Sequence, residues 1–394
     1  MRKILKSLSF CAKNMKKPVS AIALAAAAVF AMPASASGFQ SVEQNASGLG
    51  VSYAGAAAVA DNASTVYYNP AGLTGLPGVQ ISVGLVGALQ RYEFDDDGSI
   101  GLTGGEGGQA GQWRSLPNAY FSWAATPDLA FGLGVSSPYS LDLEYDRDWL
   151  GQGIGTRARI TSVNINPAIA YRLSDKVSLG FGLDYQTLKL KTAFAGASDS
   201  DSDSDLGWNA GALFTLSPAM RVGVAYRSGM KFRLDASSPT LGAFPGVNQH
   251  GRFETPDTFS LSVWQQVSDK WEAMGDISYT RWKSLDDYEH DSWRLAWGAA
   301  YTYNERWKSK FGLAYDRSPV RTSDRSVLLP DAHRLWFSLG GQYRFSQYAA
   351  LDFGYAYQRV KTSRVNETLG GGLRLRGDYD ASGHIIGVQY TQGF

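Results

Sequence analysis

The sequence predicts an all-β fold, a transmembrane antiparallel β-barrel of about 14 strands with an N-terminal hatch plugging the lumen; an even strand number is usual in bacterial barrels. Three observations lead to this fold class. Many segments after residue 78 alternate apolar and polar residues, which is the period of a strand. Short and long connections between these segments follow one another in turn. After residue 36, no run approaches the roughly 20 consecutive apolar residues that a membrane-spanning helix needs.

Residues 1–36 have the features of a signal peptide. Basic residues precede an apolar run, which ends in the small-residue cleavage signal Ala34-Ser35-Ala36. Either Met1 or Met15 is the initiator, because Met15 and the two lysines after it would start a signal peptide of ordinary length. The single cysteine, Cys11, lies before the apolar run, so we expect no thiol chemistry in the mature chain.

Composition and targeting narrow the class further. A formal net charge of +1 with 19% charged residues argues against nucleic-acid binding by bulk electrostatics. Aromatic residues make up 13% of the chain, which suits a barrel with aromatic girdles at both membrane interfaces. An exported chain with these properties is expected in the outer membrane of a Gram-negative bacterium, as a multi-pass β-barrel.

Residues 37–77 form the predicted hatch. This segment is rich in Gly, Ala, Ser and Asn and has neither a helical nor a strand period, so it cannot build a core of its own. Pro70 fixes its own φ and pushes Asn69 out of the helical region, which predicts a sharp turn at Asn69-Pro70-Ala71. We therefore expect three regions: a signal peptide at 1–36, the hatch at 37–77 and the barrel at 78–394.

The loops distinguish a membrane barrel from a soluble β-sandwich, whose strands also alternate. Two-residue turns such as Ser174-Asp175 and Ser268-Asp269 alternate with long polar connections, among them residues 95–113, 195–204 and 362–382. Outer-membrane barrels have tight periplasmic turns and long external loops. The chain also ends on Phe394, which looks like the C-terminal signal that the barrel assembly machinery reads.

Several motifs resemble one known family. Gly38-Phe39-Gln40, Ser47-Gly48-Leu49-Gly50 and Asn69-Pro70-Ala71 are similar to the hatch of the FadL family, outer-membrane transporters of long-chain fatty acids and other hydrophobic molecules. Further segments resemble that family in the same order, at residues 207–211, 225–228, 279–282, 316–320 and 330–336. The resemblance implies that the hatch plugs the barrel from the periplasmic side. It also implies that Phe39, with Asn69, Pro70 and Ala71, forms the hatch and the floor of an apolar tunnel.

The predicted third strand, Leu129 to Ser136, runs into a proline. Pro138 lacks the N–H that a strand ladder needs and should disrupt pairing. In the family, the matching strand is kinked and opens a hole in the barrel wall. The resemblance therefore implies a lateral gate made of Ser136, Ser137, Pro138, Tyr139 and Ser140. The alternative is that Pro138 only ends a strand at the outer rim.

A fatty-acid carboxylate would need a cationic partner. Where the family places basic residues, this chain has Ala193-Phe194 and a short connection at residues 285–287 instead. The lysines near these positions, Lys189, Lys191 and Lys283, are therefore the candidates. Lys189 and Lys191 share the outward parity of Tyr185, so they could instead pair with lipopolysaccharide phosphates. This leaves both fatty acids and neutral hydrocarbons open as substrates.

Two other kinds of site are less favoured. Asp199 to Asp205 alternates Asp and Ser and could bind Ca²⁺, but it lacks the glycine turn and distal glutamate of a dedicated loop, so a solvated acidic loop is preferred. His250, His290, His333 and His384 are scattered, and no serine has a nucleophile-elbow pattern. We expect no enzyme activity, no bound metal and no cofactor.

The predicted function is passive transport of hydrophobic molecules by a monomer, with long-chain fatty acids as the first substrate class. They would bind in an apolar tunnel and leave through a gap in the barrel wall. The alternatives are uptake of aromatic or aliphatic hydrocarbons, and a structural or receptor barrel that transports nothing. Expected partners are the hydrophobic small molecule, outer-membrane lipid and lipopolysaccharide, and the barrel assembly machinery, with no nucleic acid.

Overall fold

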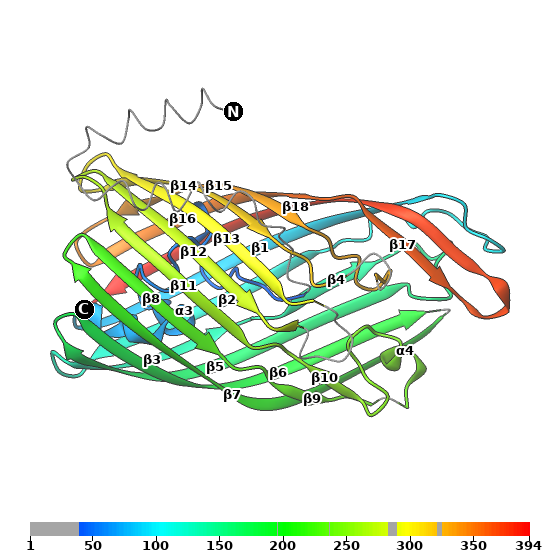
Figure 1. Cartoon of the computed structure of the whole chain (residues 1–394), viewed down its shortest axis with the longest axis horizontal. Coiled ribbons are helices and arrows are strands. Elements are labelled where there is room, and N and C mark those ends of the chain that lie inside the picture. Colours follow the sequence, from blue (N-terminus) through cyan, green and yellow to red (C-terminus); the bar gives the residue numbers. More distant parts are fainter. Residues whose placement is uncertain (1–38, 195, 236, 283–289, 321–324) are drawn as a thin grey trace, which may run out of the picture. The chain divides into compact units, whose positions relative to one another are not determined.

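Fourteen antiparallel strands close into a barrel, which confirms the predicted fold class (Figure 1). The computed structural model describes residues 39–394 except 195, 236, 283–289 and 321–324, and these residues belong to one compact unit. No helix in this described part is both long and apolar enough to cross a membrane.

Strands that follow one another in sequence are neighbours in the wall. In order around the barrel they are β1 (Val79–Asp96), β2 (Trp113–Ala124), β3 (Leu129–Ser136), β5 (Arg157–Ser174), β6 (Val177–Phe194), β7 (Ala197–Ser217), β8 (Met220–Arg227), β11 (Thr258–Gln266), β12 (Trp271–Thr280), β13 (Ser292–Thr302), β14 (Trp307–Asp316), β15 (Arg334–Arg344), β16 (Ala349–Val360) and β18 (Arg374–Gly393). The pairing of β18 with β1, from Gln80 opposite Gly393 to Asp96 opposite Gly377, closes the ring.

Other elements extend the strands or fill the connections. β4 (Ser140–Glu144) adds to β5, β17 (Ser363–Thr368) adds to β18, and β9 (Lys231–Arg233) pairs with β10 (Arg252–Glu254). The short helices are η2 (Leu49–Val51), α3 (Thr65–Tyr68), η3 (Pro70–Gly75), α4 (Pro239–Gly242) and η5 (Gly370–Gly372). In Figure 1 the C terminus and the short turns lie at one end of the barrel, whereas β17 and α4 lie at the other. The predicted sorting of loops is thus present, except that only residues 195 and 196 join β6 to β7 at the end with the long connections.

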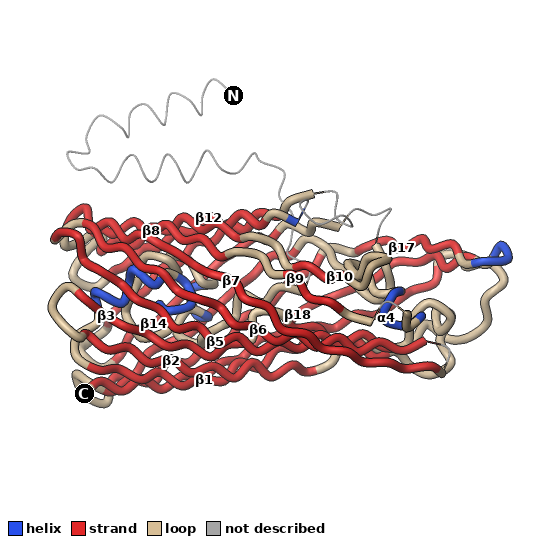
Figure 2. Tube along the Cα trace, turned by 90° about the horizontal axis from the view of Figure 1, so that it is seen from below, coloured by secondary structure: helices blue, strands red, loops and turns tan. Residues whose placement is uncertain are grey.

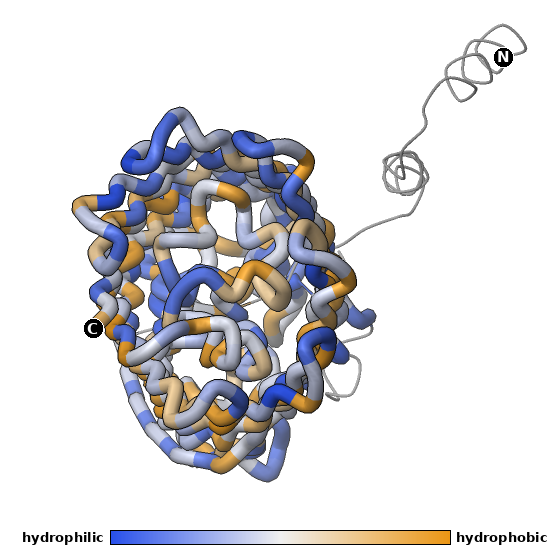
Figure 3. Tube along the Cα trace, turned by 90° about the vertical axis from the view of Figure 1, so that its left-hand side faces the viewer, coloured by the Kyte–Doolittle hydropathy of each residue, from blue (hydrophilic) through white to orange (hydrophobic). Residues whose placement is uncertain are grey.

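The outer face of the wall is apolar and the inner face is small or polar. Along β3, Phe131, Leu133 and Val135 are exposed whereas Gly132 and Gly134 between them are buried. In water such a wall would be unfavourable by about 25 cal/mol for each Å² of apolar surface, but in lipid it is the expected surface. Figure 3, which looks onto the end with the short turns, shows the ring of strands with chain inside it.

Residues 39–77, here called the hatch segment, pack inside this ring. Helices of this segment lie in the half of the barrel near the C terminus (Figure 2). Leu49 and Val51 pack in one buried cluster with Trp336 of the wall. The backbone of the hatch segment touches glycines of the wall: a Cβ on Gly312 would lie 2.2 Å from the carbonyl carbon of Val51. The small residues that face the lumen therefore leave room for the hatch segment.

Cations of the wall fix the backbone of the hatch segment. Each donates to a carbonyl oxygen of that segment and is itself paired with a carboxylate from another strand of the wall, which offsets the cost of burying its charge. The donors are Arg227 to Tyr67 (2.8 Å), Arg294 to Ser52 (2.7 Å) and Lys310 to Ser47 (2.8 Å), and their carboxylate partners are Asp184, Asp316 and Asp352. The interior of the wall is thus built to hold this segment in place.

Candidate functional site

The barrel wall is interrupted beside β3. β3 has the predicted bounds and pairs with β2 only from Ala130 opposite Ala124 to Val135 opposite Ala119. β2 continues to Trp113 along β1, but after residues 137–139 the chain resumes as β4, which joins β5 instead of β2. The two edges meet again further out at the bridge between Gly111 and Leu143, through the hydrogen bonds Gln112 N to Asp142 O (3.1 Å) and Glu144 N to Ala110 O (2.7 Å). We call the interval between the half of β2 that begins at Trp113 and residues 136–140 the wall gap.

Residues 39–44 of the hatch segment lie along the inner side of the wall gap. Because residues 137–140 lack β2 as a neighbour, their backbone groups need other partners. The bonds are Ser41 N to Pro138 O (2.8 Å), Ser140 N to Phe39 O (3.0 Å), Gln44 Nε2 to Ser137 O (2.9 Å) and Ser137 N to Gln44 Oε1 (2.8 Å). Residues 39–44 therefore take the place of the missing strand neighbour.

Arg114 on β2 spans the wall gap. Its Nη1 donates to both the carbonyl oxygen and the hydroxyl of Ser140, each at 2.7 Å, and the same hydroxyl lies 3.2 Å from the Ser41 hydroxyl. Arg114 is not among the site residues predicted from the sequence. Its parity could have placed it on the inner face with Leu116 and Asn118, but its partner depends on how β4 is positioned.

A buried glutamate lies in residues 39–44. Glu43 is only 4% exposed, and no ion pair is found for it in the described part of the chain. Burial raises the pKa of the Glu43 carboxyl, and the nearby Arg114 cation partly opposes this shift. The seated arrangement of residues 39–44 therefore favours the protonated carboxyl.

Phe39 lies at the base of a large buried apolar cluster. Its ring centroid is 5.2 Å from that of Phe253, 5.2 Å from that of Trp282 and 5.8 Å from that of Tyr139. The cluster, here called the external apolar cluster, gathers residues from the outer strand extensions and the long connections, among them Trp149, Ile160, Leu188, Leu190, Phe232, Leu234, Phe244 and Tyr379. Phe39 thus separates this cluster from the rest of the hatch segment.

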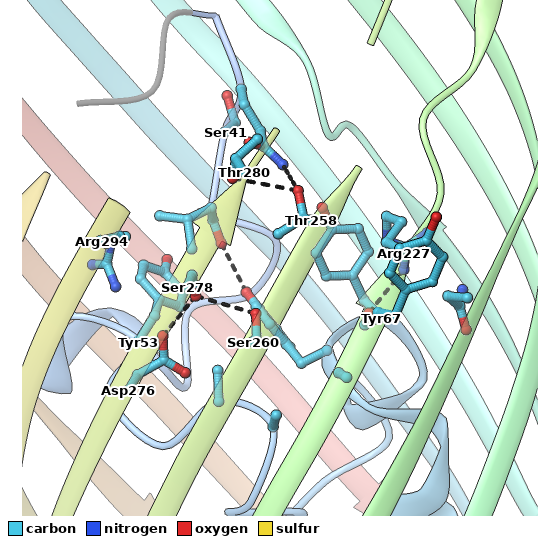
Figure 4. Close-up of a pocket in the computed structure, with 18 of the residues that line it drawn as sticks. Ser41, Tyr53, Tyr67, Arg227, Thr258, Ser260, Asp276, Ser278, Thr280 and Arg294 are labelled. Atoms are coloured by element: carbon cyan, nitrogen blue, oxygen red, sulfur yellow. Dashed lines mark hydrogen bonds between the residues drawn. The ribbon is translucent and has the colours of Figure 1, made fainter. Parts of the chain in front are cut away.

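A pocket of mixed, mainly apolar lining, here called the lumen pocket, lies beside residues 40–42, between the hatch segment and the wall strands β8, β11, β12 and β13 (Figure 4). It encloses about 900 Å³ not filled by atoms, including its open mouth. Gln40 closes part of it by donating to Thr258 at 3.2 Å. Both arginines that line it, Arg227 and Arg294, are already paired with carboxylates. These two cations are therefore neutralised within the protein.

Asn69 anchors the predicted Asn69-Pro70-Ala71 turn. Its side chain accepts a hydrogen bond from Ala71 N at 3.1 Å and so caps η3, which begins at Pro70. The side-chain amide also donates to the carbonyl oxygens of Ala57 (2.7 Å) and of Ala212 on β7 (3.1 Å). One side chain thereby makes the turn and ties it to the wall.

The candidate headgroup lysines are not brought together at the wall gap. Lys189 and Lys191 lie on the outer face of β6, in step with the exposed Leu183 and Tyr185, and neither lines the lumen pocket. This placement does not support a role for them in the lumen. Lys283 lies outside the described residues, and Trp282 precedes it.

The Asp-Ser segment is a strand, so the predicted long connection at residues 195–204 and the solvated acidic loop are wrong. β7 starts at Ala197 and pairs with β6 throughout this stretch, from Ala197 opposite Phe194 to Asp205 opposite Gln186. The alternation explains why: the serines face outward, while the aspartates share the inward face of Leu188 and Leu190.

These aspartates, here called the Asp ladder, bind the connection between β8 and β11. The bonds are Lys231 N to Asp205 (2.7 Å), Arg233 N to Asp203 (2.7 Å), Asp235 N to Asp201 (2.8 Å), and Ser238 Oγ (2.6 Å) and Thr240 Oγ1 (3.0 Å) to Asp199. No group of three or more His, Cys, Asp or Glu in the described part of the chain could hold a metal ion. The ladder carboxylates hold a loop that covers the external apolar cluster.

The fold and this site define a class of protein. A closed barrel with an apolar outer wall, short turns at one end and a filled lumen is an outer-membrane barrel. Comparison with known proteins gives the family: the model described as outer membrane protein transport protein (OMPP1/FadL/TodX) matches residues 27–198 and 192–394. The chain belongs to this family of outer-membrane transporters of hydrophobic compounds, and it is located in the outer membrane of a Gram-negative bacterium.

Individual relatives cover nearly the whole chain. It is 29% identical over 428 residues to outer membrane protein P1 of Haemophilus influenzae, a match that spans 90% of this chain and 92% of that protein. It is 28% identical over 411 residues to the long-chain fatty acid transport protein of Salmonella typhi, with 88% and 93% covered. The resemblance seen in the sequence is thus confirmed.

Two solved structures show the same fold. A Pseudomonas aeruginosa FadL homologue has a TM-score of 0.81 at 21% identity, with 91% of this chain and 100% of that chain covered. The P. putida toluene transporter TodX has a TM-score of 0.63 at 16% identity, with 84% and 94% covered. At these identities the likeness concerns the fold alone.

Proposed function

We propose that this protein takes up long-chain fatty acids from outside the cell and releases them sideways into the outer membrane through the wall gap. The observation that carries the proposal is that residues 39–44 of the hatch segment occupy the wall gap and that Phe39 of the same segment packs against the external apolar cluster. A substrate that enters the cluster would meet Phe39, and movement of residues 39–44 would uncover the gap.

Lateral release suits an apolar substrate. Each CH₂ group kept out of water contributes about 0.8 kcal/mol, so a long acyl chain gains by passing from the external apolar cluster to lipid without entering the periplasm. The names of relatives such as the long-chain fatty acid transport protein of Salmonella typhi support this substrate class. Monomeric transport and contact with the barrel assembly machinery are part of the same proposal.

For the fatty-acid headgroup we propose Lys283 instead of Lys189 or Lys191. Lys283 directly follows Trp282, whose ring contacts Phe39, whereas the other two lysines lie on the outer face of β6. Lys283→Gln should lower fatty-acid affinity by about 10-fold, the effect of losing one hydrogen bond between charged groups. The double variant Lys189→Gln/Lys191→Gln is the matched control and should bind like wild type.

Neutral hydrocarbons are the second candidate substrate. Both arginines of the lumen pocket are paired with carboxylates, so neither offers an uncompensated charge to a fatty acid. Affinity for oleate that is unchanged in Lys283→Gln would favour this alternative. Binding of toluene to the same variants separates the two substrate classes.

A reversible crosslink tests the lateral route. The hydroxyl oxygens of Ser41 and Ser140 are 3.2 Å apart, so cysteines at both positions should form a disulfide that fastens residues 39–44 across the wall gap. The mature chain has no other cysteine to confuse the pairing. Oleate uptake by cells should stop when the bond is oxidised and return on reduction, while either single cysteine variant transports normally. Wild-type uptake by the oxidised protein would show that the substrate leaves by another route.

A further inference from the structure

On β14, β15 and β16 the outward-facing residues change from apolar to cationic over about four residues along each strand. Outward-facing residues that lie opposite one another form rows across these strands. The first row is Leu313, Phe337 and Tyr357, and the second is Tyr315, Leu335 and Arg359. Continuing both registers by two residues toward the long loops gives the third row, which is Arg317, His333 and Lys361. The backbone N–H of Lys361 donates to His333 O at 2.7 Å, so the pairing does extend this far.

The position of these rows relative to the membrane follows from their side chains. Leu313 and Phe337 are 53% and 48% exposed, as lipid-facing residues of a barrel are. Trp293 on β13 is in line with the third row, because Arg317 N donates to Trp293 O at 2.9 Å. Aromatic side chains of this kind mark the interface of a membrane barrel. The cations therefore begin where the hydrocarbon layer ends on the outer side.

The three cations of these rows, Arg317, Arg359 and Lys361, are here called the cation row. No ion pair is found for any of them within the described residues, and Arg359 and Lys361 are exposed on the outside. Like charges on neighbouring strands repel one another, and no carboxylate of the described residues offsets this repulsion. A bound anion would therefore reduce the repulsion between these cations.

Three other outward cations differ in this respect. Arg91 pairs with Glu93 at 2.7 Å, Arg364 pairs with Asp378 at 3.1 Å and Arg376 pairs with Asp97 at 3.3 Å. On β1, β17 and β18, therefore, these exterior charges are balanced within the protein. The cation row differs from them; among the described residues, Lys189 and Lys191 on the outer face of β6 also have no ion pair, but they lie on a single strand.

His333 adds a neutral donor beside the cation row. Its Nδ1 accepts a hydrogen bond from Ser318 N at 3.2 Å, so the proton of the neutral ring is on Nε2. Partial burial lowers the pKa of His333. The cations Lys361 and Arg317 lower it further, whereas the carboxylate of Asp331 raises it. The ring can thus donate one hydrogen bond without adding to the repulsion.

We propose that the cation row binds the phosphate groups of lipid A in the outer leaflet, with the acyl chains lying along the apolar rows below. Charge and position both select this partner: Arg forks match phosphate oxygens, and the adjoining rows of Leu335 and Phe337 accept only an apolar surface. A free phosphate ion would use the charges but not these apolar rows. The site faces outward and is separate from the proposed transport route in the lumen.

The test compares the triple variant Arg317→Gln/Arg359→Gln/Lys361→Gln with the matched triple variant Arg91→Gln/Arg364→Gln/Arg376→Gln, which loses the same charge elsewhere on the exterior. Binding of bisphosphorylated lipid A to the full-length protein in detergent is measured, with dephosphorylated lipid A and inorganic phosphate as further probes. The cation-row variant should lose on the order of 10-fold or more in affinity for bisphosphorylated lipid A, the control should keep wild-type affinity, and dephosphorylated lipid A should bind all three proteins weakly.

Several results would overturn the assignment. They are equal lipid A affinity in the cation-row variant and wild type, an equal loss in the control variant, or displacement of lipid A by inorganic phosphate at a similar concentration, which would indicate a site for the free ion. Heat-modifiable migration reports whether each variant forms its barrel. If the triple variant does not, Lys361→Gln alone, at an exposed position, should show a smaller loss of the same kind, and its absence counts against the proposal.

Discussion

Arg114 reaches across the wall gap and donates from Nη1 to the carbonyl oxygen and the hydroxyl of Ser140, both at 2.7 Å. β2 and β4 are not paired strands, but the chain just before β2 is joined to β4 by the backbone hydrogen bonds Gln112 N to Asp142 O (3.1 Å) and Glu144 N to Ala110 O (2.7 Å). Arg114 adds a side-chain link at the end of this short ladder that borders the wall gap, and a bond to a cation is stronger than one between neutral groups.

Arg114→Ala should therefore loosen the wall gap. Loss of hydrogen bonds worth roughly 1.5 to 3 kcal/mol should raise hydrogen exchange at the amides of Ser41 and Ser140 by about 10-fold or more, without affecting amides of β11 or β12. Arg114→Lys keeps the charge but not the forked guanidinium, so its exchange rates should lie between those of the wild type and the alanine variant. Unchanged exchange at Ser140 in the alanine variant would mean that residues 39–44 and the backbone bonds from residues 110–112 to residues 142–144 hold the edges without Arg114.

Phe39 should decide whether residues 39–44 stay in place. Its ring is 2% exposed and contacts Phe253 and Trp282, so Phe39→Ala should cost the seated segment about 3 to 5 kcal/mol. We expect lower oleate affinity and faster cleavage of residues 39–44 by an added protease in detergent. Phe39→Leu, which keeps most of the apolar volume, should behave nearly like wild type. Equal cleavage rates for the alanine and leucine variants would contradict this role of the ring.

Much of this architecture could be predicted because it depends on local pattern. Alternation along Leu179 to Leu183 gives the two faces of β6, and it also placed Lys189 and Lys191 on the outside, where the structure has them. Pro138 marked the end of β3 because a proline has no N–H for the ladder. These inferences use only neighbouring residues and the strand period.

Contacts between distant segments could not be predicted in this way. Arg114 meets Ser140 only because β4 follows β5 and leaves β2 without a partner. The alternating Asp and Ser residues predict a loop, whereas the structure has a strand. The carboxylates of the Asp ladder accept hydrogen bonds from backbone N–H groups such as that of Arg233, 30 residues further along the chain, and no local pattern indicates these partners. A strand with an acidic inner face is stable only when such partners are present.

The Asp ladder leads to a prediction about the loop over the external apolar cluster. Asp201→Asn/Asp203→Asn/Asp205→Asn should weaken the hold on residues 231–235, because a neutral amide oxygen accepts less strongly than a carboxylate. Protease added to intact cells should then cut this loop several-fold faster. The matched control is Ser200→Ala/Ser202→Ala/Ser204→Ala, on the opposite face of β7, which should leave the rate unchanged. A similar increase in both variants would mean that the β6–β7 hairpin itself has loosened.

The last prediction concerns the pH dependence of the seated segment. Burial raises the pKa of Glu43 above its value in an exposed chain, although Arg114 reduces the shift. A carboxyl whose pKa is raised in the seated state binds its proton more tightly there than when released. Its contribution is therefore fully favourable at a pH below the ordinary carboxyl pKa, and it is lost as the pH rises through the raised value. Residues 39–44 should accordingly be held less firmly at neutral pH than at mildly acidic pH.

Glu43→Gln should remove this dependence, since the amide cannot ionise, and should hold residues 39–44 more firmly at neutral pH. Hydrogen exchange at Ser41, corrected for the intrinsic rate at each pH, measures the effect. Glu106→Gln, at an exposed glutamate of the connection between β1 and β2, is the control and should keep the wild-type profile. If Glu43→Gln and wild type show the same corrected change with pH, another group controls the segment and the carboxyl of Glu43 is not the titrating group.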